Sequence, residues 1–178
     1  MNDPKWCVAS NIGGRDYMED RSTVFMYGEH RFFGVYDGHG GKEVSEFLHR
    51  NLHTLVCRNL PKDVVAATDD ALRQAVQNGF KQANDVLRSE NNKHKRFSYQ
   101  GSTAVVVLAL TDGRCVLGSV GDSEALLVKA GNVQVQLHRI HKPNHADERR
   151  RIESHGEFVS NRRLNGRLAM SRAFADFQ

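Results

Sequence analysis

The sequence predicts an α+β domain in which helices cover antiparallel strands. Short runs of apolar, aromatic and β-branched residues, bounded by glycine, predict strands in the first forty residues and again after residue 101. Between these blocks, apolar residues recur every three or four positions, which is the period of an amphipathic helix. Strands, two long helices and more strands favour a layered α+β domain over alternating βαβ units.

Three strands are expected in the first block. Trp6–Ile12 precedes a glycine pair that predicts a turn. Ser22–Tyr27 and Arg31–Tyr36 lie on either side of a short turn at residues 28–30, which is the pattern of an antiparallel hairpin. Two helices are then expected, Gly41–Cys57 and, after Pro61, Asp63–Glu90, each with one apolar face.

The second block opens with Ala104–Leu110, a continuous apolar run that is typical of a strand covered on both faces. An Asp-Gly pair at 112–113 predicts a hairpin turn into a returning strand. The further expected elements are strands Arg114–Val120, Ala125–Lys129 and Val133–Leu137, a helix over Ala146–Ser154, and a tail from Arg163 to Phe177 without a clear pattern.

Composition narrows the class of protein. A chain of 178 residues, 39% hydrophobic and 26% charged, has the length and balance of one soluble domain, 1–178, with its own core. Its cysteines, Cys7, Cys57 and Cys115, are widely spaced, which favours the reduced thiols of a cytoplasmic or nuclear protein. No run of about 18 apolar residues and no signal-peptide pattern is present, so membrane and secreted classes are not expected.

The net charge of +4 raises the question of nucleic acid. Basic residues cluster at 93–96 and 149–151, but neither cluster is interleaved with the aromatic side chains on which bases stack. Solvated basic surfaces are therefore favoured over a nucleic-acid site.

The segment Tyr36-Asp37-Gly38-His39-Gly40-Gly41 is the most informative in the chain. It places an acid where an apolar strand ends in a sharp glycine turn. Glu19 and Asp20 lie upstream, with Arg15 just before them. Three carboxylates, an arginine, a histidine and glycine backbone form an oxygen-rich set suited to a divalent cation and a phosphate.

An ordered series of motifs extends this pattern through the chain: Arg15-Asp16-Tyr17-Met18-Glu19-Asp20, Val35 to Gly41, Gly101-Ser102-Thr103-Ala104, Val120-Gly121-Asp122-Ser123, His141-Lys142-Pro143, Glu148, Arg151-Ile152 and Leu164 to Phe174. In this order the motifs resemble those of the metal-dependent protein phosphatases of the type 2C class. The resemblance implies a four-layer αββα sandwich of two antiparallel sheets flanked by antiparallel helices, with a two-metal site at one end.

The resemblance also implies roles for single residues. Asp37 would bridge two Mg²⁺ or Mn²⁺ ions and Gly38 would add its carbonyl. Glu19 and Asp20 would hold metal-bound waters. Arg15 would grip the phosphate, and His39 would be the general acid for the departing serine or threonine oxygen of a phosphorylated protein substrate.

Other candidates have simpler interpretations. His49 and His53 lie four apart on a helix, a spacing that could bind zinc, but no third ligand accompanies them, so surface histidines are favoured. His141, four residues before His145, belongs to a motif taken as structural. Ser102, Thr103 and Ser123 lack a nucleophile elbow and are expected to pack at strand edges.

The chain departs from the family pattern at three places. Ile140 stands where the family has an aspartate before His-Lys-Pro, and Glu124 replaces an arginine in the Gly-Asp-Ser-Arg hairpin. The sequence reaches Gln178 just after the Ser-Arg-Ala motif, whereas the family continues into strands that carry two more aspartates. We therefore expect weak metal binding, and an uncovered sheet edge that favours self-association.

Two functions remain open at this point. The first is a metal-dependent protein serine/threonine phosphatase. The second is a catalytically impaired pseudophosphatase that binds phosphoproteins or other partners.

Overall fold

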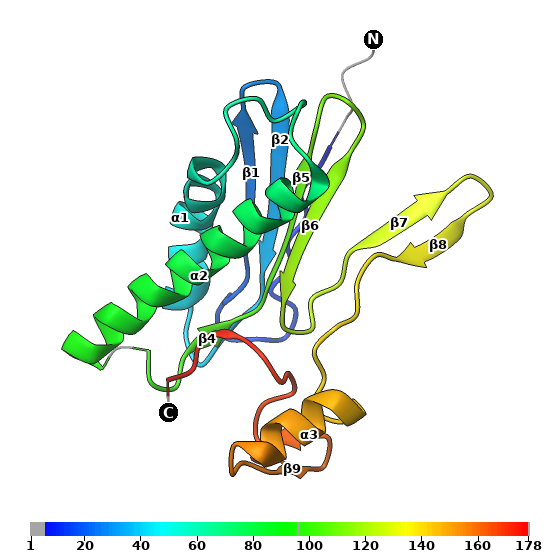
Figure 1. Ribbon diagram of the computed structural model, residues 1–178. Coiled ribbons are helices and arrows are strands. Elements are labelled where there is room, and N and C mark those ends of the chain that lie inside the picture. Colours follow the sequence, from blue (N-terminus) through cyan, green and yellow to red (C-terminus); the bar gives the residue numbers. More distant parts are fainter. Residues whose placement is uncertain (1–5, 96, 178) are drawn as a thin grey trace.

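The computed structural model describes residues 6–95 and 97–177 (Figure 1). Its helices are α1 (Glu43–Arg58), α2 (Asp69–His94) and α3 (Ala146–Ser154). Its strands are β1 (Arg21–Tyr27), β2 (His30–Tyr36), β3 (Gly38–His39), β4 (Gly101–Ser102), β5 (Ala104–Ala109), β6 (Cys115–Val120), β7 (Leu126–Lys129), β8 (Val133–Gln136), β9 (Val159–Ser160), β10 (Arg163–Leu164) and β11 (Phe174–Ala175). None of the helices in this described part is long and apolar enough to cross a membrane.

The main sheet has four strands in the order β1-β2-β5-β6, and every described strand pairing is antiparallel. The α+β class is confirmed, and so is the first hairpin, in which Tyr27 pairs with His30 across a two-residue turn. Long-range pairing of β2 with β5 joins the two sequence blocks, since Val35 lies opposite Val105.

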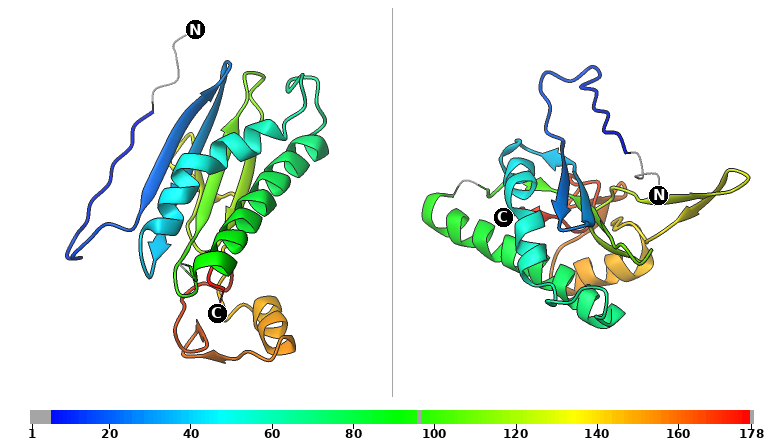
Figure 2. Two further views of the ribbon diagram at one scale, coloured as in Figure 1. Left: turned by 90° about the vertical axis from the view of Figure 1, so that its left-hand side faces the viewer. Right: turned by 90° about the horizontal axis from the view of Figure 1, so that it is seen from above.

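Helices α1 and α2 lie together on one face of this sheet (Figure 2). Alternate β2 side chains point toward them, because successive residues of a strand face opposite sides. Phe32 and Tyr36 are fully buried there against Leu48, Leu52 and Leu72. This helix–sheet layer holds most of the hydrophobic core.

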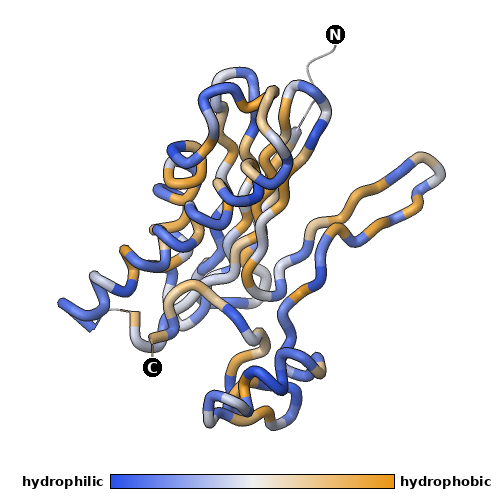
Figure 3. The backbone as a smooth tube through the Cα atoms, in the orientation of Figure 1, coloured by the Kyte–Doolittle hydropathy of each residue, from blue (hydrophilic) through white to orange (hydrophobic). Residues whose placement is uncertain are grey.

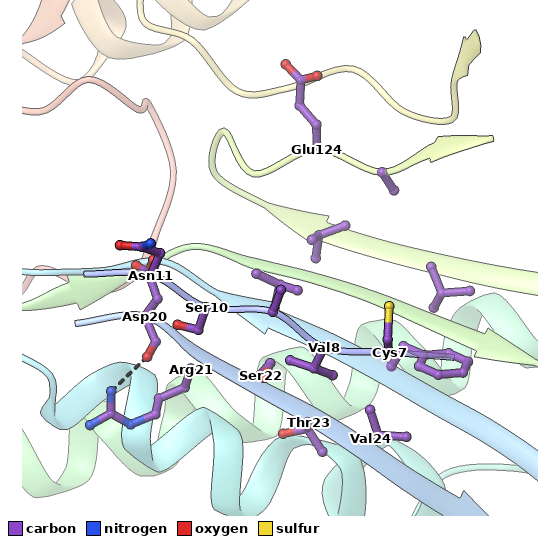
Figure 4. Close-up of a pocket in the computed structure, with 17 residues that line it drawn as sticks. Cys7, Val8, Ser10, Asn11, Asp20, Arg21, Ser22, Thr23, Val24 and Glu124 are labelled. Atoms are coloured by element: carbon purple, nitrogen blue, oxygen red, sulfur yellow. Dashed lines mark hydrogen bonds between the residues drawn. The ribbon is translucent and has the colours of Figure 1, made fainter. Parts of the chain in front are cut away.

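The N-terminal segment runs along the other face of the sheet, and the predicted strand Trp6–Ile12 is wrong. Residues 6–12 run past the sheet without pairing with a described strand (Figure 2). Their backbone therefore gains no ladder hydrogen bonds, and more than half of the Trp6 and Val8 surface stays exposed. A gap of about 660 Å³, lined by Val8, Val24, Val35 and Val107 among others, separates this segment from the sheet (Figure 4).

Helix α2 begins six residues later than predicted. The Thr68 side chain accepts a hydrogen bond from the Ala71 N–H at 3.2 Å and so caps the helix at Asp69. Before it, Asp63 accepts from the Ala66 N–H at 3.0 Å in a separate turn. The helix ends at His94, four residues later than predicted, and the following Lys95 adopts the left-handed conformation.

The later elements differ in how well they were predicted. Helix α3 has the expected bounds, and the β7–β8 hairpin forms but projects from the body with Leu126–Val128 exposed (Figures 1 and 3). Strands β3, β4, β9, β10 and β11 were not predicted, because two-residue strands leave no periodic pattern.

Glu148 of α3 anchors the C-terminal segment. Its carboxylate is 4% exposed and accepts hydrogen bonds from Arg151 (2.8 Å), Ser171 (2.6 Å) and Arg172 (2.5 Å). Burial favours the neutral acid, but these three donors outweigh it and hold the pKa of Glu148 well below its usual range. The chain from Ser171 onward is thereby fixed to α3.

We predict that Gly79→Ala destabilises the protein by about 1–3 kcal/mol, because overpacking the contact between α1 and α2 outweighs the better helix propensity of alanine. An added Cβ would lie 2.6 Å from Val56 Cγ2 and 2.8 Å from Val56 Cα. Urea unfolding measures the change, with exposed Gln77→Ala on the same helix as the control. A more stable Gly79→Ala protein would contradict the close helix contact.

We predict that Glu148→Gln lowers the free energy of unfolding by about 2 kcal/mol at pH 7. Because the folded pKa of Glu148 lies below the unfolded value, this stabilisation is present above the unfolded pKa and is lost as pH falls through the folded pKa. The difference between wild type and variant should therefore shrink below about pH 4. Exposed Glu153→Gln, which breaks a surface pair with Arg149, is the control and should change stability by less than about 0.5 kcal/mol. A pH-independent Glu148→Gln difference would refute the ion-pair account.

Candidate active site

Asp37 lies where β2 ends, and its backbone is held by the start of the second block. The Thr103 N–H donates to the Asp37 carbonyl at 2.9 Å, and the Asp37 N–H donates back to Thr103 Oγ1 at 3.1 Å. Ser102 Oγ donates to the same carbonyl at 3.2 Å. Both hydroxyl residues are completely buried, so the Gly-Ser-Thr motif positions Asp37 and is no nucleophile.

Three other acids lie in the neighbourhood of Asp37. Loss of hydration raises the pKa of Asp37, and the charges of Asp20, Asp122 and Glu19 raise it further, while His39 acts in the opposite direction. The carboxyl groups therefore repel one another at this point.

Gly38 and Glu19 fit closely together. A Cβ on Gly38 would lie 2.6 Å from the Glu19 carbonyl and 2.8 Å from Ser45 Oγ, so only glycine fits. The Glu19 carboxylate accepts a hydrogen bond from the Gly41 N–H at 2.6 Å, and Ser45 Oγ donates to the Glu19 carbonyl. These bonds fix the loop before β1 against the turn that follows Asp37.

His39 has a partner that sequence reasoning missed. Its Nε2 lies 2.6 Å from Asp176 Oδ2, and both side chains are mostly buried. Burial lowers the pKa of His39, but the hydrogen bond and charge of Asp176, with Asp37 and Glu19, outweigh it and raise the pKa above its usual value. Asp176 therefore favours the protonated imidazole.

A three-stranded sheet makes this contact. Strand β4 pairs with β3 on one side and β11 on the other, so Gly38 and Phe174 both lie opposite Ser102. Asp176 follows β11 in the left-handed conformation, and its N–H donates to the Gln100 carbonyl at 3.0 Å. Its position two residues after the Ser-Arg-Ala-Phe run was the available sequence signal.

Asp122 is a second acid that sequence reasoning did not place at the site. Lys142 forms an ion pair with it. In the same turn, the His141 N–H donates to the Gly121 carbonyl at 2.8 Å, and the Gly121 N–H donates to His141 Nδ1 at 3.1 Å. The His-Lys-Pro motif thus holds the Gly-Asp-Ser turn beside Asp37.

Arg15 and Asp20 are less constrained. Both are exposed, and within residues 6–95 and 97–177 no hydrogen bond or ion pair of the Arg15 guanidinium is found. Arg15 is not among the main influences on the pKa of Asp37. Proximity of Arg15 to Asp37 therefore stays a prediction.

Chemically, the donor set suits a hard divalent cation. Carboxylate and carbonyl oxygens are the ligands that Mg²⁺ and Mn²⁺ prefer, and a cation would relieve the repulsion around Asp37. In the described part of the chain, however, no three Asp, Glu, His or Cys side chains form a cage that could hold a metal ion. The oxygen donors fit the ions in kind, but they are not gathered into a closed site.

Among the described residues, His49 and His53 belong to no metal site. His49 Nδ1 lies 2.7 Å from the Ser22 carbonyl, and the His53 ring packs on Phe25 with ring centroids 4.5 Å apart. They were expected at the surface, but both are half-buried between α1 and the sheet.

Comparison with known proteins agrees with these features. A family model described as "Protein phosphatase 2C" matches residues 17–178. "Probable protein phosphatase 2C 59" of Arabidopsis thaliana is 37% identical over 178 residues, covering 94% of this chain and 53% of that protein. "Probable protein phosphatase 2C 21" of Oryza sativa subsp. japonica is 34% identical, covering 97% of this chain and 57% of that protein.

Solved structures show the same fold. A serine-threonine phosphatase 2C from Toxoplasma gondii superposes with a TM-score of 0.73 at 27% identity, covering 93% of this chain and 66% of that one. A C. elegans sex-determining protein gives a TM-score of 0.78 at 27% identity, covering 92% and 42%. The chain spans about half the length of the curated relatives it matches. It belongs to the protein phosphatase 2C family.

Proposed function

We propose that this chain carries the main part of the active site of a metal-dependent protein serine/threonine phosphatase. The observation that supports it most is the group of acids around Asp37, beside a histidine that is hydrogen-bonded to Asp176. Metal-assisted phosphoester hydrolysis requires acids that can bind a divalent cation, and it requires a proton donor next to them. The substrate class is phosphoserine or phosphothreonine in a protein.

Asp37 and the Gly38 carbonyl would hold Mg²⁺ or Mn²⁺, with Glu19 and Asp20 orienting bound water. When bound, the ions would supply a nucleophilic water at neutral pH and neutralise phosphoryl charge. Arg15 would bind two phosphate oxygens through its planar guanidinium.

His39 would donate a proton to the departing serine or threonine oxygen. Asp176 supports this role because its carboxylate accepts the Nε2 hydrogen bond and favours the charged imidazole. A substrate oxygen would have to displace Asp176 from Nε2 or receive the proton from Nδ1, which is buried and has no hydrogen-bond partner among the described residues.

A second candidate is a pseudophosphatase that binds phosphoproteins without cleaving them. Two observations favour it. The described residues present no preformed cage of three metal-binding side chains, and Ile140 cannot coordinate a cation. Metal binding and turnover, measured separately, distinguish the two functions.

We also propose that the chain self-associates. Strands β1 and β6 are the two edges of the main sheet, and unpaired strand edges are templates for pairing with another chain.

Free cysteines at 7, 57 and 115 agree with a reducing cytoplasmic or nuclear location.

Asp37→Asn should weaken Mn²⁺ binding at least tenfold, because it removes the charge at the centre of the proposed site. Isothermal titration calorimetry measures this in the 178-residue chain. Asp85→Asn, which changes an exposed carboxylate of α2 paired only weakly with Lys81, is the matched control and should bind as wild type does. Equal Mn²⁺ affinity for Asp37→Asn and wild type would exclude Asp37 as a ligand.

The 178-residue chain should hydrolyse p-nitrophenyl phosphate with Mn²⁺ far more slowly than a complete relative, because few anionic ligands hold the ions. Adding the C-terminal half of such a relative, fused or as a separate chain, should restore turnover that EDTA abolishes. Full turnover by the monomeric chain alone would show that acids such as Asp122 and Asp176 complete the site. Absence of turnover after completion would instead select the pseudophosphatase.

A further inference from the structure

A pocket opens next to the His39–Asp176 pair. It has a volume of about 300 Å³ and is lined by Asp176 itself, by Arg151 and Arg172, and by the apolar side chains of Leu164, Leu168 and Met170. Because Asp176 Oδ2 also touches His39 Nε2, the pocket and the proposed active site share a wall. A bound chain could occupy both.

The surroundings of this pocket carry the positive charge of the protein. Residues 139–172 contain nine Arg and Lys against four Asp and Glu, whereas the rest of the chain contains 16 against 17. The chain's charge of +4 is therefore concentrated on the segment that includes α3, β9 and β10. This segment lies together at one end of the molecule, below the main sheet (Figure 1).

One donor in the pocket wall lacks an acceptor. Arg151 uses one terminal nitrogen to bind Glu148 and the Ser171 carbonyl, at 2.8 and 2.7 Å. Its Nε–H is buried and has no hydrogen-bond partner among the described residues. Buried donors are ordinarily paired, so an acceptor from a ligand would satisfy this one. A peptide carbonyl or carboxylate would serve.

We propose that this pocket is a specificity subsite that binds an acidic segment of the phosphoprotein substrate, with one large apolar side chain inserted between Leu164, Leu168 and Met170. The proposal rests on the proposed phosphatase site. An apolar floor of this size holds a single leucine-like side chain, and the arginines around it attract Asp and Glu on either side. The substrate class is thus an acidic sequence with an apolar residue near the phosphorylated one.

A polynucleotide is the other polyanion that such a surface could attract. The apolar floor argues against it, since nucleic acid would leave that floor empty. The described part of residues 139–172 also contains one aromatic side chain apart from histidines, Phe158, and it does not line the pocket.

Fluorescence anisotropy of labelled phosphoserine peptides, in EDTA so that no hydrolysis occurs, tests the proposal on the 178-residue chain. We expect an acidic peptide with leucine two residues from the phosphoserine to bind about tenfold tighter than its alanine version. Replacing the acidic residues of the peptide with serine should also weaken its affinity about tenfold. This loss of affinity should become smaller as the salt concentration rises. Equal affinity for the leucine and alanine peptides, or displacement of the peptide by a mixed-sequence oligonucleotide at lower concentration, would overturn the proposal.

Variants separate the two contributions. Ala173→Leu fills the pocket and should remove the preference for the leucine peptide while retaining the preference for acidic peptides. Leu168→Ala enlarges the pocket and should weaken the affinity for the leucine peptide alone. Arg162→Glu, in the exposed turn before Leu164, should reduce the acidic preference, whereas Lys62→Glu, far from the pocket in sequence and exposed, should not. Unchanged preferences in the two pocket variants and in Arg162→Glu would refute the subsite, provided that thermal melts show all three proteins folded.

The same peptides, presented to the completed protein with Mn²⁺, distinguish this inference from the proposed function. Turnover without sequence preference would support the phosphatase and eliminate the subsite. Retained binding preference without turnover would support the subsite and eliminate catalysis.

Discussion

The pair of hydrogen bonds between Asp37 and Thr103 is the constraint on which the rest of the structure depends. It joins the residue after β2 to the residue before β5, across 66 residues of sequence. At this point the chain leaves the main sheet from β2 and later enters it again at β5. The helices α1 and α2 occupy the sequence between these strands and must therefore return over the sheet. The same bonds fix the backbone of the acid around which the other carboxylates gather.

A second set of interactions brings the C-terminal segment to that point. Glu148 binds Arg151, Ser171 and Arg172, and from there the chain enters β11, which pairs with β4 and delivers Asp176 to His39. The proposed site is thus assembled from four parts of the sequence: residues 19–41, residues 101–103, the turn at Asp122 and the tail. The charged cluster around Glu148 thus positions a residue of the proposed site, Asp176.

Much of the helix–sheet layer could be predicted, because the regular spacing of apolar residues in a long helix or strand indicates which face is buried. The apolar run of β5 and the hairpin β1–β2 are examples. Asp37, Glu19 and His39 were found from their motifs. Asp176 was not, since its role depends on a two-residue strand and a left-handed turn, neither of which leaves a pattern. Trp6–Ile12 was wrong for a related reason: its alternation suits a strand, but strand formation needs a partner, which sequence pattern alone does not reveal.

The separation of His39 from Asp176 has a consequence for biosynthesis. The two residues lie 137 positions apart, so at about 5–20 residues per second the ribosome needs roughly 7–27 s to make the second after the first. During that interval the main sheet and both long helices can form, while His39 still lacks its hydrogen-bond partner Asp176. A nascent chain would therefore form its core well before the His39–Asp176 pair of the proposed site is complete.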